Sequence, residues 1–308
     1  MTTGTIRLKG LVRTRLSSRP VDWSGYLFIT PYMLVYAVFL LLPVVWSLTM
    51  TFQRGGALGG LTWCGLCNYV GETSVWTNRL FLQAVRNTVI YTLLVVPCAM
   101  LLSLGLAVLI DRLASWLQTL IKVALFLPMV SSVVSLSIIW KALFTPGSNG
   151  PLNWLVGLIG IPPQNWLGNA ELVIPSIVAF EIWRGYGFWV IVFLAGLSAI
   201  PRDLYDAAHV DGADGWQIFR HITLPLLRPT FLFLTVMGVI WNFQIFDAVY
   251  MLTSGGPANS SATVVYYVYR NAFHFENLGY AATMGFLLFV VVLIFTVIQL
   301  RLLRSDEE

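Results

Sequence analysis

The sequence predicts an all-α polytopic membrane protein with six transmembrane helices. Only 10% of its 308 residues are Asp, Glu, Lys or Arg, against roughly 25% in an ordinary soluble chain. Apolar residues make up 57%, and the mean hydropathy is +0.78. A soluble domain could not cover such a surplus with so few charges, so a soluble globular protein, a disordered chain and a disulfide scaffold are excluded. Period-2 alternation is absent, which disfavours a transmembrane β-barrel.

Six runs with few or no charges are each long enough for a helix of about 20 residues, the length that crosses a bilayer. They cover residues 26–49, the stretch centred on 89–109, residues 122–141, 172–197 and 229–250, and the stretch between 276 and 301. Pro43 is expected to kink the first span, and Pro128 lies inside the third. We therefore expect residues 25–304 to form one six-span domain.

Basic residues predict the orientation of these spans. The N-terminal tail, residues 1–24, holds five of them: Arg7, Lys9, Arg13, Arg15 and Arg19. The positive-inside rule places this tail in the cytoplasm, and six spans return the C-terminal tail, residues 305–308, to the same side. Twelve of the eighteen Lys and Arg residues then lie inside, five lie outside and Arg184 lies within a span. They are too few and too scattered to indicate nucleic-acid binding.

Three long connections, residues 52–83, 142–171 and 252–277, fall on the outside. They are expected to be surface loops with a short interfacial helix, or a docking surface for an external partner. Cys64 and Cys67 form a Cys-x-x-Cys pair in the first connection, which is either a disulfide or two free thiols. The three histidines show no metal-ligand spacing, so no metal site is expected.

The connection of residues 201–229, called the 201–229 loop below, is predicted to form two short helices on the cytoplasmic side. It contains four of the fourteen acidic residues and two of the three histidines. Asp203 is expected to N-cap the first helix, and Gly212 and Gly215 permit a sharp turn before the second. Such a projection is either a folded loop between spans or a docking element through which a partner protein moves the membrane helices.

The 201–229 loop resembles the cytoplasmic coupling loop of bacterial ABC importer permeases. That family's pattern is Glu-Ala-Ala, three residues, Gly, nine residues, Ile, one residue and Leu-Pro. Here it reads Asp206-Ala207-Ala208, Gly212, Ile222 and Leu224-Pro225, with every spacing kept and Asp in place of Glu. The resemblance implies that an ATPase subunit docks on these residues: Asp206, Ala207, Ala208, Asp211, Gly212, Trp216 and Phe219.

Other segments resemble the carbohydrate branch of that family. They are residues 245–257, Gly65-Leu66-Cys67-Asn68-Tyr69 and Asn87-Thr88. The chain is similar to the first permease of the heterodimeric pair in maltose- or glycerol-phosphate-type importers. The resemblance implies a type I ABC importer permease fold, a place in the bacterial inner membrane, and import of a sugar or sugar-like solute.

The same resemblance implies partners. They are a second homologous permease subunit, two ATP-binding subunits, an extracytoplasmic solute-binding protein, membrane lipid and a sugar-type substrate. The chain lacks the Gly-Lys-Ser/Thr of a P-loop, because Lys9, Lys122 and Lys141 are followed by Gly, Val and Ala. We therefore expect no enzyme activity and no cofactor in this chain, with ATP and Mg on the partner ATPase.

Ionisable residues inside a span are candidates for substrate binding. Glu181 and Arg184 are three residues apart in the fourth span and can pair, either as a structural ion pair or within a site. The resemblance places the family's sugar-lining positions in the fourth and fifth spans, with Glu181 and Phe188 in place of Asn and Tyr, and Gly238 in place of Ser. The candidate substrate-binding residues are Glu181, Arg184, Gly185, Phe188, Gly238, Asn242 and Gln244.

Three alternatives stay open on the sequence alone. An ion-coupled secondary transporter would need coupling carboxylates within spans and internal repeats, and only Glu181 clearly qualifies. An ABC permease for a non-carbohydrate solute is the second, and Arg184 permits an anionic group. An integral-membrane enzyme would need a nucleophile or a metal constellation, and the sequence shows neither.

Overall fold

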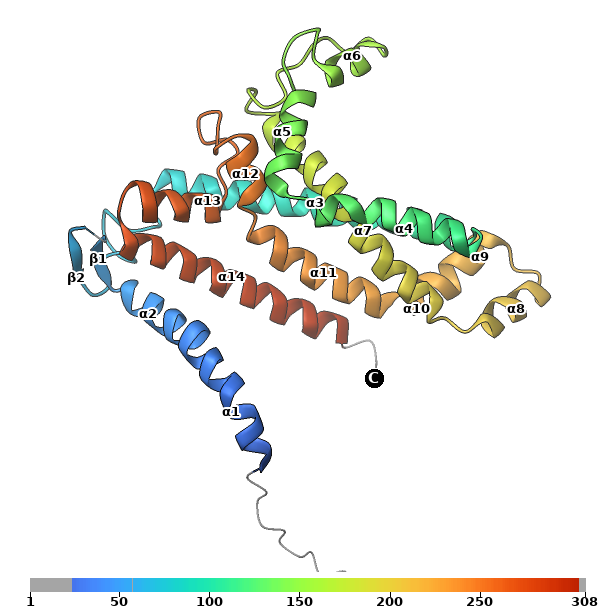
Figure 1. Cartoon of the computed structure of the whole chain (residues 1–308), viewed down its shortest axis with the longest axis horizontal. Coiled ribbons are helices and arrows are strands. Elements are labelled where there is room, and N and C mark those ends of the chain that lie inside the picture. Colours follow the sequence, from blue (N-terminus) through green and yellow to red (C-terminus); the bar gives the residue numbers. More distant parts are fainter. Residues whose placement is uncertain (1–23, 57, 305–308) are drawn as a thin grey trace, which may run out of the picture. The chain divides into compact units, whose positions relative to one another are not determined.

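The computed structural model describes residues 24–56 and 58–304. It divides into two compact units, one up to Trp46 and one from Ser47 onward, and each unit is described by itself. The described chain is mainly helical, and its longest helices coincide with predicted spans (Figure 1). The predicted tails, residues 1–24 and 305–308, lie outside the described residues except for Ser24.

The first predicted span is one continuous helical run with a wide turn inside it. The run comprises α1 (Ser24–Tyr36), the π-helical turn η1 (Ala37–Leu41) and α2 (Leu42–Met50). Where η1 ends, the amide of Leu42 donates to the carbonyl of Ala37, five residues back. Pro43 has no amide hydrogen to donate to the carbonyl four residues before it. The irregularity predicted at Pro43 therefore takes the form of a π-helical turn directly before the proline.

Four helical runs among the described residues are long and apolar enough to cross a membrane, and two bent pairs raise the number to six. The four are Tyr26–Met50, α3 (Arg79–Asp111), α7 (Val173–Ser198) and α14 (Leu278–Arg304). The bent pairs are α4 (Ser115–Val130) with α5 (Val133–Leu143), and the helical stretch Gly215–Leu226 with α11 (Arg228–Phe243). The predicted class, a helical protein with several membrane spans, is confirmed.

The third predicted span is not a single helix, so that expectation is wrong. α4 and α5 meet at a bend of 95°, where Ser131 and Ser132 have extended backbone. The amide and the hydroxyl of Ser131 both donate to the carbonyl of Leu127, at 3.2 and 2.9 Å. A serine hydroxyl that competes for a helical carbonyl favours bending or ending the helix, and hydropathy does not register this effect.

The fifth predicted span is too long. α11 ends at Phe243, and a separate helix, α12 (Asp247–Leu252), begins after the turn at residues 244–246. The hydroxyl of Thr263 donates to the carbonyl of Ile245 in this turn at 3.0 Å. A side chain thus satisfies a backbone group that the end of the helix leaves unpaired.

α3 begins earlier than the predicted second span. The side chain of Asn78 accepts hydrogen bonds from the amides of Leu80 and Phe81, at 3.0 and 3.1 Å, which is the geometry of an N-cap. Arg79 and Arg86 are both inside the helix. The helix therefore extends about two turns before the predicted span, because a helix can continue past the charged residue that limits its apolar stretch.

The three long connections contain small elements of their own. The first holds an antiparallel hairpin that the sequence did not predict, followed directly by a disulfide between Cys64 and Cys67. Short helices occur in the other two, as expected. These elements are β1 (Gln53–Gly56), β2 (Gly60–Trp63), α6 (Pro151–Gly157), α13 (Val264–Tyr269) and the π-helical η3 (Arg270–His274).

The third connection is held against α3 by polar side chains. Asn87 donates to the carbonyls of Asn259 and Ala262, at 3.1 and 3.0 Å. The hydroxyl of Thr88 accepts a hydrogen bond from the amide of Val264 at 3.0 Å. The Asn87-Thr88 pair therefore satisfies backbone groups of the connection that packs on α3.

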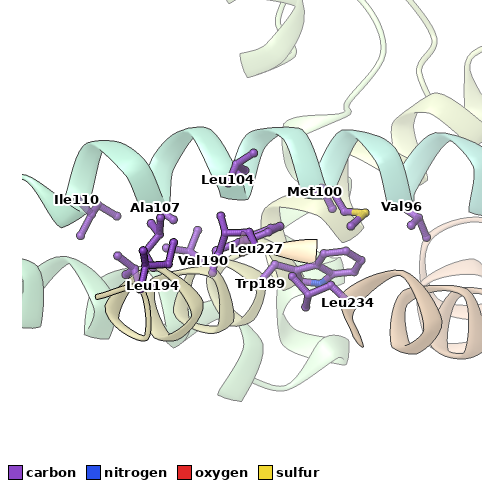
Figure 2. Close-up of a cluster of buried hydrophobic side chains, with 14 residues drawn as sticks. Val96, Met100, Leu104, Ala107, Ile110, Trp189, Val190, Leu194, Leu227 and Leu234 are labelled. Carbon is purple, nitrogen blue, oxygen red and sulfur yellow. The ribbon is translucent and has the colours of Figure 1, made fainter. Parts of the chain in front are cut away.

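One of three apolar clusters in the second unit forms where α3 and α7 pack together and α11 joins them. Figure 2 shows side chains of α3 facing those of α7 across this cluster. Its labelled members are Val96, Met100, Leu104, Ala107, Ile110, Trp189, Val190, Leu194, Leu227 and Leu234.

A glycine lets α7 lie directly against α4. A Cβ atom at Gly187 would collide with the backbone carbonyl oxygen of Leu125 in α4. Gly185, two residues earlier on the same helix, has open space at the corresponding point. Helices in a bilayer rely on such close backbone approach, because lipid is as apolar as their own side chains.

We expect Gly187→Ala to destabilise the protein, because the new methyl group meets backbone that cannot move aside. Overpacking of this kind costs about 1–3 kcal/mol, so the apparent unfolding temperature of the purified protein should fall by several degrees. Gly185→Ala is the matched control, and its unfolding temperature should stay close to that of the wild type. Equal unfolding temperatures for the two variants would contradict the packing described for Gly187.

Candidate functional site

A cavity of about 370 Å³ lies beside the middle of α7. Residues of α3, α4, α7, α11 and α12 contribute to its wall. It lies where α11 has ended and α12 begins, so the turn at residues 244–246 forms part of the wall. Polar side chains on the wall include Tyr91, Glu181, Arg184, Asn242, Gln244 and Asp247.

Glu181 and Arg184 form an ion pair on the cavity wall. Arg184 Nη2 lies 2.7 Å from Glu181 Oε2, and Arg184 Nε lies 3.2 Å from Glu181 Oε1. Both carboxylate oxygens are thus engaged by one guanidinium group, which is the strong bidentate arrangement. The Glu181 side chain is 10% exposed and that of Arg184 is 26% exposed, so the pair is largely shielded from solvent.

The structure brings together six of the seven predicted substrate-binding residues. Those that line the cavity are Glu181, Arg184, Gly185, Phe188, Asn242 and Gln244. The four from α7 lie on one side of the helix because residues three or four apart are neighbours on a helical surface. The side-chain amide of Asn242 donates to the carbonyl of Gly238 at 2.8 Å, which orients the amide group at the cavity wall.

Gly238 is the predicted residue that does not line the cavity. It is buried, and a Cβ atom there would lie 2.5 Å from Cη2 of Trp189. Its missing side chain makes room for the Trp189 ring, which does line the cavity. The structure therefore places Gly238 behind the wall, as a packing residue.

Two aromatic residues that could have served as sugar platforms also pack elsewhere. The ring of Trp183 lies 5.4 Å from that of Trp140, and the ring of Phe243 lies 5.6 Å from that of Phe295. Neither lines the cavity. Trp241 and Phe188 do line it, with ring centroids 5.4 Å apart.

Tyr91 and Asp247 line the cavity but were not assigned to a site from the sequence. The hydroxyl of Tyr91 is buried and has no hydrogen-bond partner among the described residues. Tyr91 follows Asn87 by one helical turn, so a polar stripe within an apolar span was the available signal. Asp247 lies inside the predicted fifth span, residues 229–250, whereas the structure places it at the start of α12.

The cavity is suited to binding rather than to bond-making chemistry. It offers amides, a hydroxyl and an ion pair for polar groups, and aromatic rings for apolar surface, which is the usual make-up of a small-molecule site. Among the described residues, no group of three or more His, Cys, Asp or Glu side chains could hold a metal ion.

The 201–229 loop forms the two predicted helical segments, joined at Gly212. They comprise α8 (Arg202–Val210), then α9 (Gly215–Ile218), the π-helical η2 (Phe219–Thr223) and α10 (Leu224–Leu226) in succession. Gly212 has a φ angle of +77°, a conformation that residues with a side chain rarely adopt.

The helix caps of the loop differ from the predicted ones. The expectation that Asp203 caps the first helix is wrong, because α8 already begins at Arg202 and Asp203 lies in its first turn. Asp214 forms a capping box with Gln217 instead, with hydrogen bonds of 2.7 and 2.9 Å. This cap fixes the start of the second helical segment.

One face of the loop is exposed and the other is attached to the spans. Asp206, Ala207, Asp211 and Gly212 are exposed, and Ala208 is half-buried. The ring of Trp216, which is 66% exposed, stacks on the ring of Phe219 at 5.7 Å.

Apolar packing attaches this face of the loop to the spans, and a pair of hydroxyl groups links the loop's two segments. Phe219 packs against the apolar core. The hydroxyl groups of Tyr205 and Thr223 lie 3.2 Å apart, which links the two helical segments. The predicted coupling residues therefore lie on a projection whose base is fixed to the membrane helices.

Comparison with known proteins agrees with this geometry. The family model described as "binding-protein-dependent transport system inner membrane component" matches residues 79–305. The arabinooligosaccharides transport system permease protein AraP of Bacillus subtilis is 32% identical, covering 92% of this chain and 89% of AraP. The lactose transport system permease protein LacF of Rhizobium radiobacter is 34% identical, covering 94% of this chain and 97% of LacF.

A solved structure shows the same fold. It is a bacterial ABC transporter involved in the import of the acidic polysaccharide alginate, and it superposes with a TM-score of 0.81 at 24% identity, covering 93% of this chain and 97% of the matched chain. The chain has the type I ABC importer permease fold, and it belongs to the family of inner membrane components of binding-protein-dependent transport systems.

Proposed function

We propose that this chain is the permease subunit of an ATP-driven importer for a sugar or a sugar-like solute. The observation that carries the proposal is the cavity beside α7, where amide, hydroxyl and charged groups meet aromatic rings. The curated relatives AraP and LacF, named for arabinooligosaccharides and lactose, support a carbohydrate substrate. Family membership does not favour the ion-coupled transporter or the membrane enzyme considered from the sequence.

The proposal includes the assembly in which the chain works. A second homologous permease would complete the pathway, with this chain as the first of the pair. Two ATP-binding subunits would supply ATP hydrolysis with Mg, so this chain carries no cofactor of its own. An extracytoplasmic binding protein would deliver the solute, in keeping with the family description. Both termini of this chain would face the cytoplasm.

The 201–229 loop would transmit the motion of the ATPases. Three apolar side chains on its surface are strongly exposed, at 43% for Leu204, 87% for Val210 and 66% for Trp216. Exposed apolar surface of this kind is typical of a protein interface. Because Phe219 packs into the core, a force on the loop would reach the helices that line the cavity and shift the equilibrium between inward-open and outward-open states.

We expect Gly185→Trp to abolish uptake, because an indole ring at this position would occupy the open space of the cavity. The measurement is ATP-dependent accumulation of labelled oligosaccharides by proteoliposomes that hold the complete transporter and its binding protein. Gly185→Ala is the control and should keep at least about half of the wild-type rate, since a methyl group meets nothing there. Normal uptake by the tryptophan variant would show that the solute passes elsewhere.

We expect Gly212→Pro to uncouple transport from ATP hydrolysis. Proline requires a φ angle near −65°, whereas Gly212 has +77°, so the two helical segments could not keep their angle. The rate of uptake should fall at least tenfold, which corresponds to a loss of about 1.4 kcal/mol or more of coupling free energy. The ATPase activity of the assembled complex should persist. Gly215→Ala, at a glycine without positive φ and with open space around it, should behave as wild type. Equal transport by the two variants would contradict the proposal that the 201–229 loop transmits the motion of the ATPases.

A further inference from the structure

Three side chains that are charged at neutral pH line the cavity beside α7, and two of them neutralise each other. Arg184 is held by Glu181 through hydrogen bonds of 2.7 and 3.2 Å. The third is Asp247, at the start of α12. The formal charges of the three add to −1. Among the described residues that form the wall, the one cation, Arg184, is therefore already paired with a carboxylate.

An anionic solute would meet two obstacles in this cavity. Nε and Nη2 of Arg184 are both engaged with Glu181, so a carboxylate or phosphate could take this side-on pair of donors only by displacing Glu181, and at the other donors it would meet a guanidinium charge that Glu181 already neutralises. Displacement would leave Glu181, whose side chain is 10% exposed, as an unpaired carboxylate in a largely apolar setting, which is unfavourable. Asp247 adds like-charge repulsion from the same wall.

A solute that presents only hydroxyl groups meets neither obstacle. The Tyr91 hydroxyl has no partner within the described part of the chain, and the Asn242 and Gln244 amides can each donate and accept. Phe188 and Trp241, with ring centroids 5.4 Å apart, offer apolar surface to the C–H faces of a sugar ring. These groups fit the polar and apolar faces of an uncharged sugar.

We propose that the Glu181–Arg184 pair makes the cavity selective for uncharged sugars, and that Glu181 is the residue that excludes sugars carrying a carboxylate or a phosphate. The inference rests on the proposed function, because it assigns a substrate class to the same cavity. Glu181 determines specificity by occupying Arg184, which would otherwise bind an anion.

The test measures equilibrium binding of matched sugars to the complete transporter in nanodiscs, without ATP and without the binding protein, whose own specificity would mask that of the permease. The probes are radiolabelled lactose and maltose, and their acids lactobionate and maltobionate. The wild type should bind the neutral sugars about tenfold or more tightly than the acids, since an acid must break a bidentate pair. Glu181→Gln, which keeps the size of the side chain and releases Arg184, should raise the affinity for the acids at least about tenfold.

Two further variants separate the ion pair from general electrostatics and from misfolding. Asp247→Asn changes the formal charge of the cavity by the same amount as Glu181→Gln but leaves Arg184 paired. It should therefore raise the affinity for the acids by less than about threefold. The double variant Glu181→Gln/Arg184→Gln removes both charges of the pair, so neither position keeps an unpaired charge. It should lack the gain in acid affinity that Glu181→Gln produces.

Several results would overturn the inference. They are equal binding of acids and neutral sugars by the wild type, a gain of acid affinity in Asp247→Asn as large as in Glu181→Gln, or a double variant that binds the acids as tightly as Glu181→Gln. If Glu181→Gln does not assemble, a gain of acid affinity of tenfold or more in Asp247→Asn, in which Arg184 stays paired, overturns it. Parallel uptake assays with the binding protein keep the two proposals apart. Uptake of neutral sugars together with equal binding of acids overturns only the charge selectivity, whereas a wild type that neither binds nor imports any probe counts against both proposals.

Discussion

The close approach of α7 to α4 at Gly187 is the constraint on which the rest of the site depends. A helix turns by about 100° per residue, so fixing Gly187 against the backbone of Leu125 also fixes the direction of every other residue of α7. Measured around the helix axis from Gly187, Arg184, Phe188, Glu181 and Gly185 fall at about 60°, 100°, 120° and 160°. These four positions span an arc of about 100°, and all of them line the cavity. A rotation of α7 by one residue would turn much of this face away from the cavity.

A second constraint comes from the backbone, since the interior of a bilayer offers no water to unpaired amide and carbonyl groups. The turn at residues 244–246 interrupts the fifth span, yet the Thr263 hydroxyl pairs with the carbonyl of Ile245, and the rest of the turn lines the cavity. Non-helical backbone at this depth is tolerated where it borders a cavity or is held by side chains. The side chains of Asn87 and Thr88 likewise form hydrogen bonds with backbone groups of the third connection. Polar side chains in the spans thus have a structural role as well as a place in the site.

Hydropathy and charge placement were sufficient to find the spans, because a bilayer imposes a fixed length of apolar chain. Composition and residue spacing were sufficient to find the 201–229 loop, whereas most residues of the cavity wall were predicted from the family resemblance. The break at Ser131 and Ser132 was not predictable in this way, because both serines lie within an otherwise apolar run that contains Pro128 as a stronger signal. The position of Gly238 behind the cavity wall was not predictable, because it depends on Trp189, a residue on another helix. The Asp214–Gln217 capping box, by contrast, was predictable from the sequence, because an Asp followed three residues later by a Gln is the usual spacing of such a cap.

The 33 residues of α3 rise about 50 Å, whereas the hydrocarbon layer of a bilayer is about 30 Å thick. The uncharged stretch between Arg86 and Asp111 accounts for about 36 Å of that rise, which a moderate tilt accommodates. The two turns that precede it, starting from the Asn78 cap, extend beyond the hydrocarbon as a stalk. The Asn78 amide donates to the hydroxyls of Tyr267 and Tyr280, at 3.2 and 3.0 Å, so the stalk is braced by the two segments nearest to it. The part of α3 that exceeds the thickness of the hydrocarbon layer thus supports the elements outside the bilayer. The position of these elements is set by their contacts with α3 and not by the lipid surface.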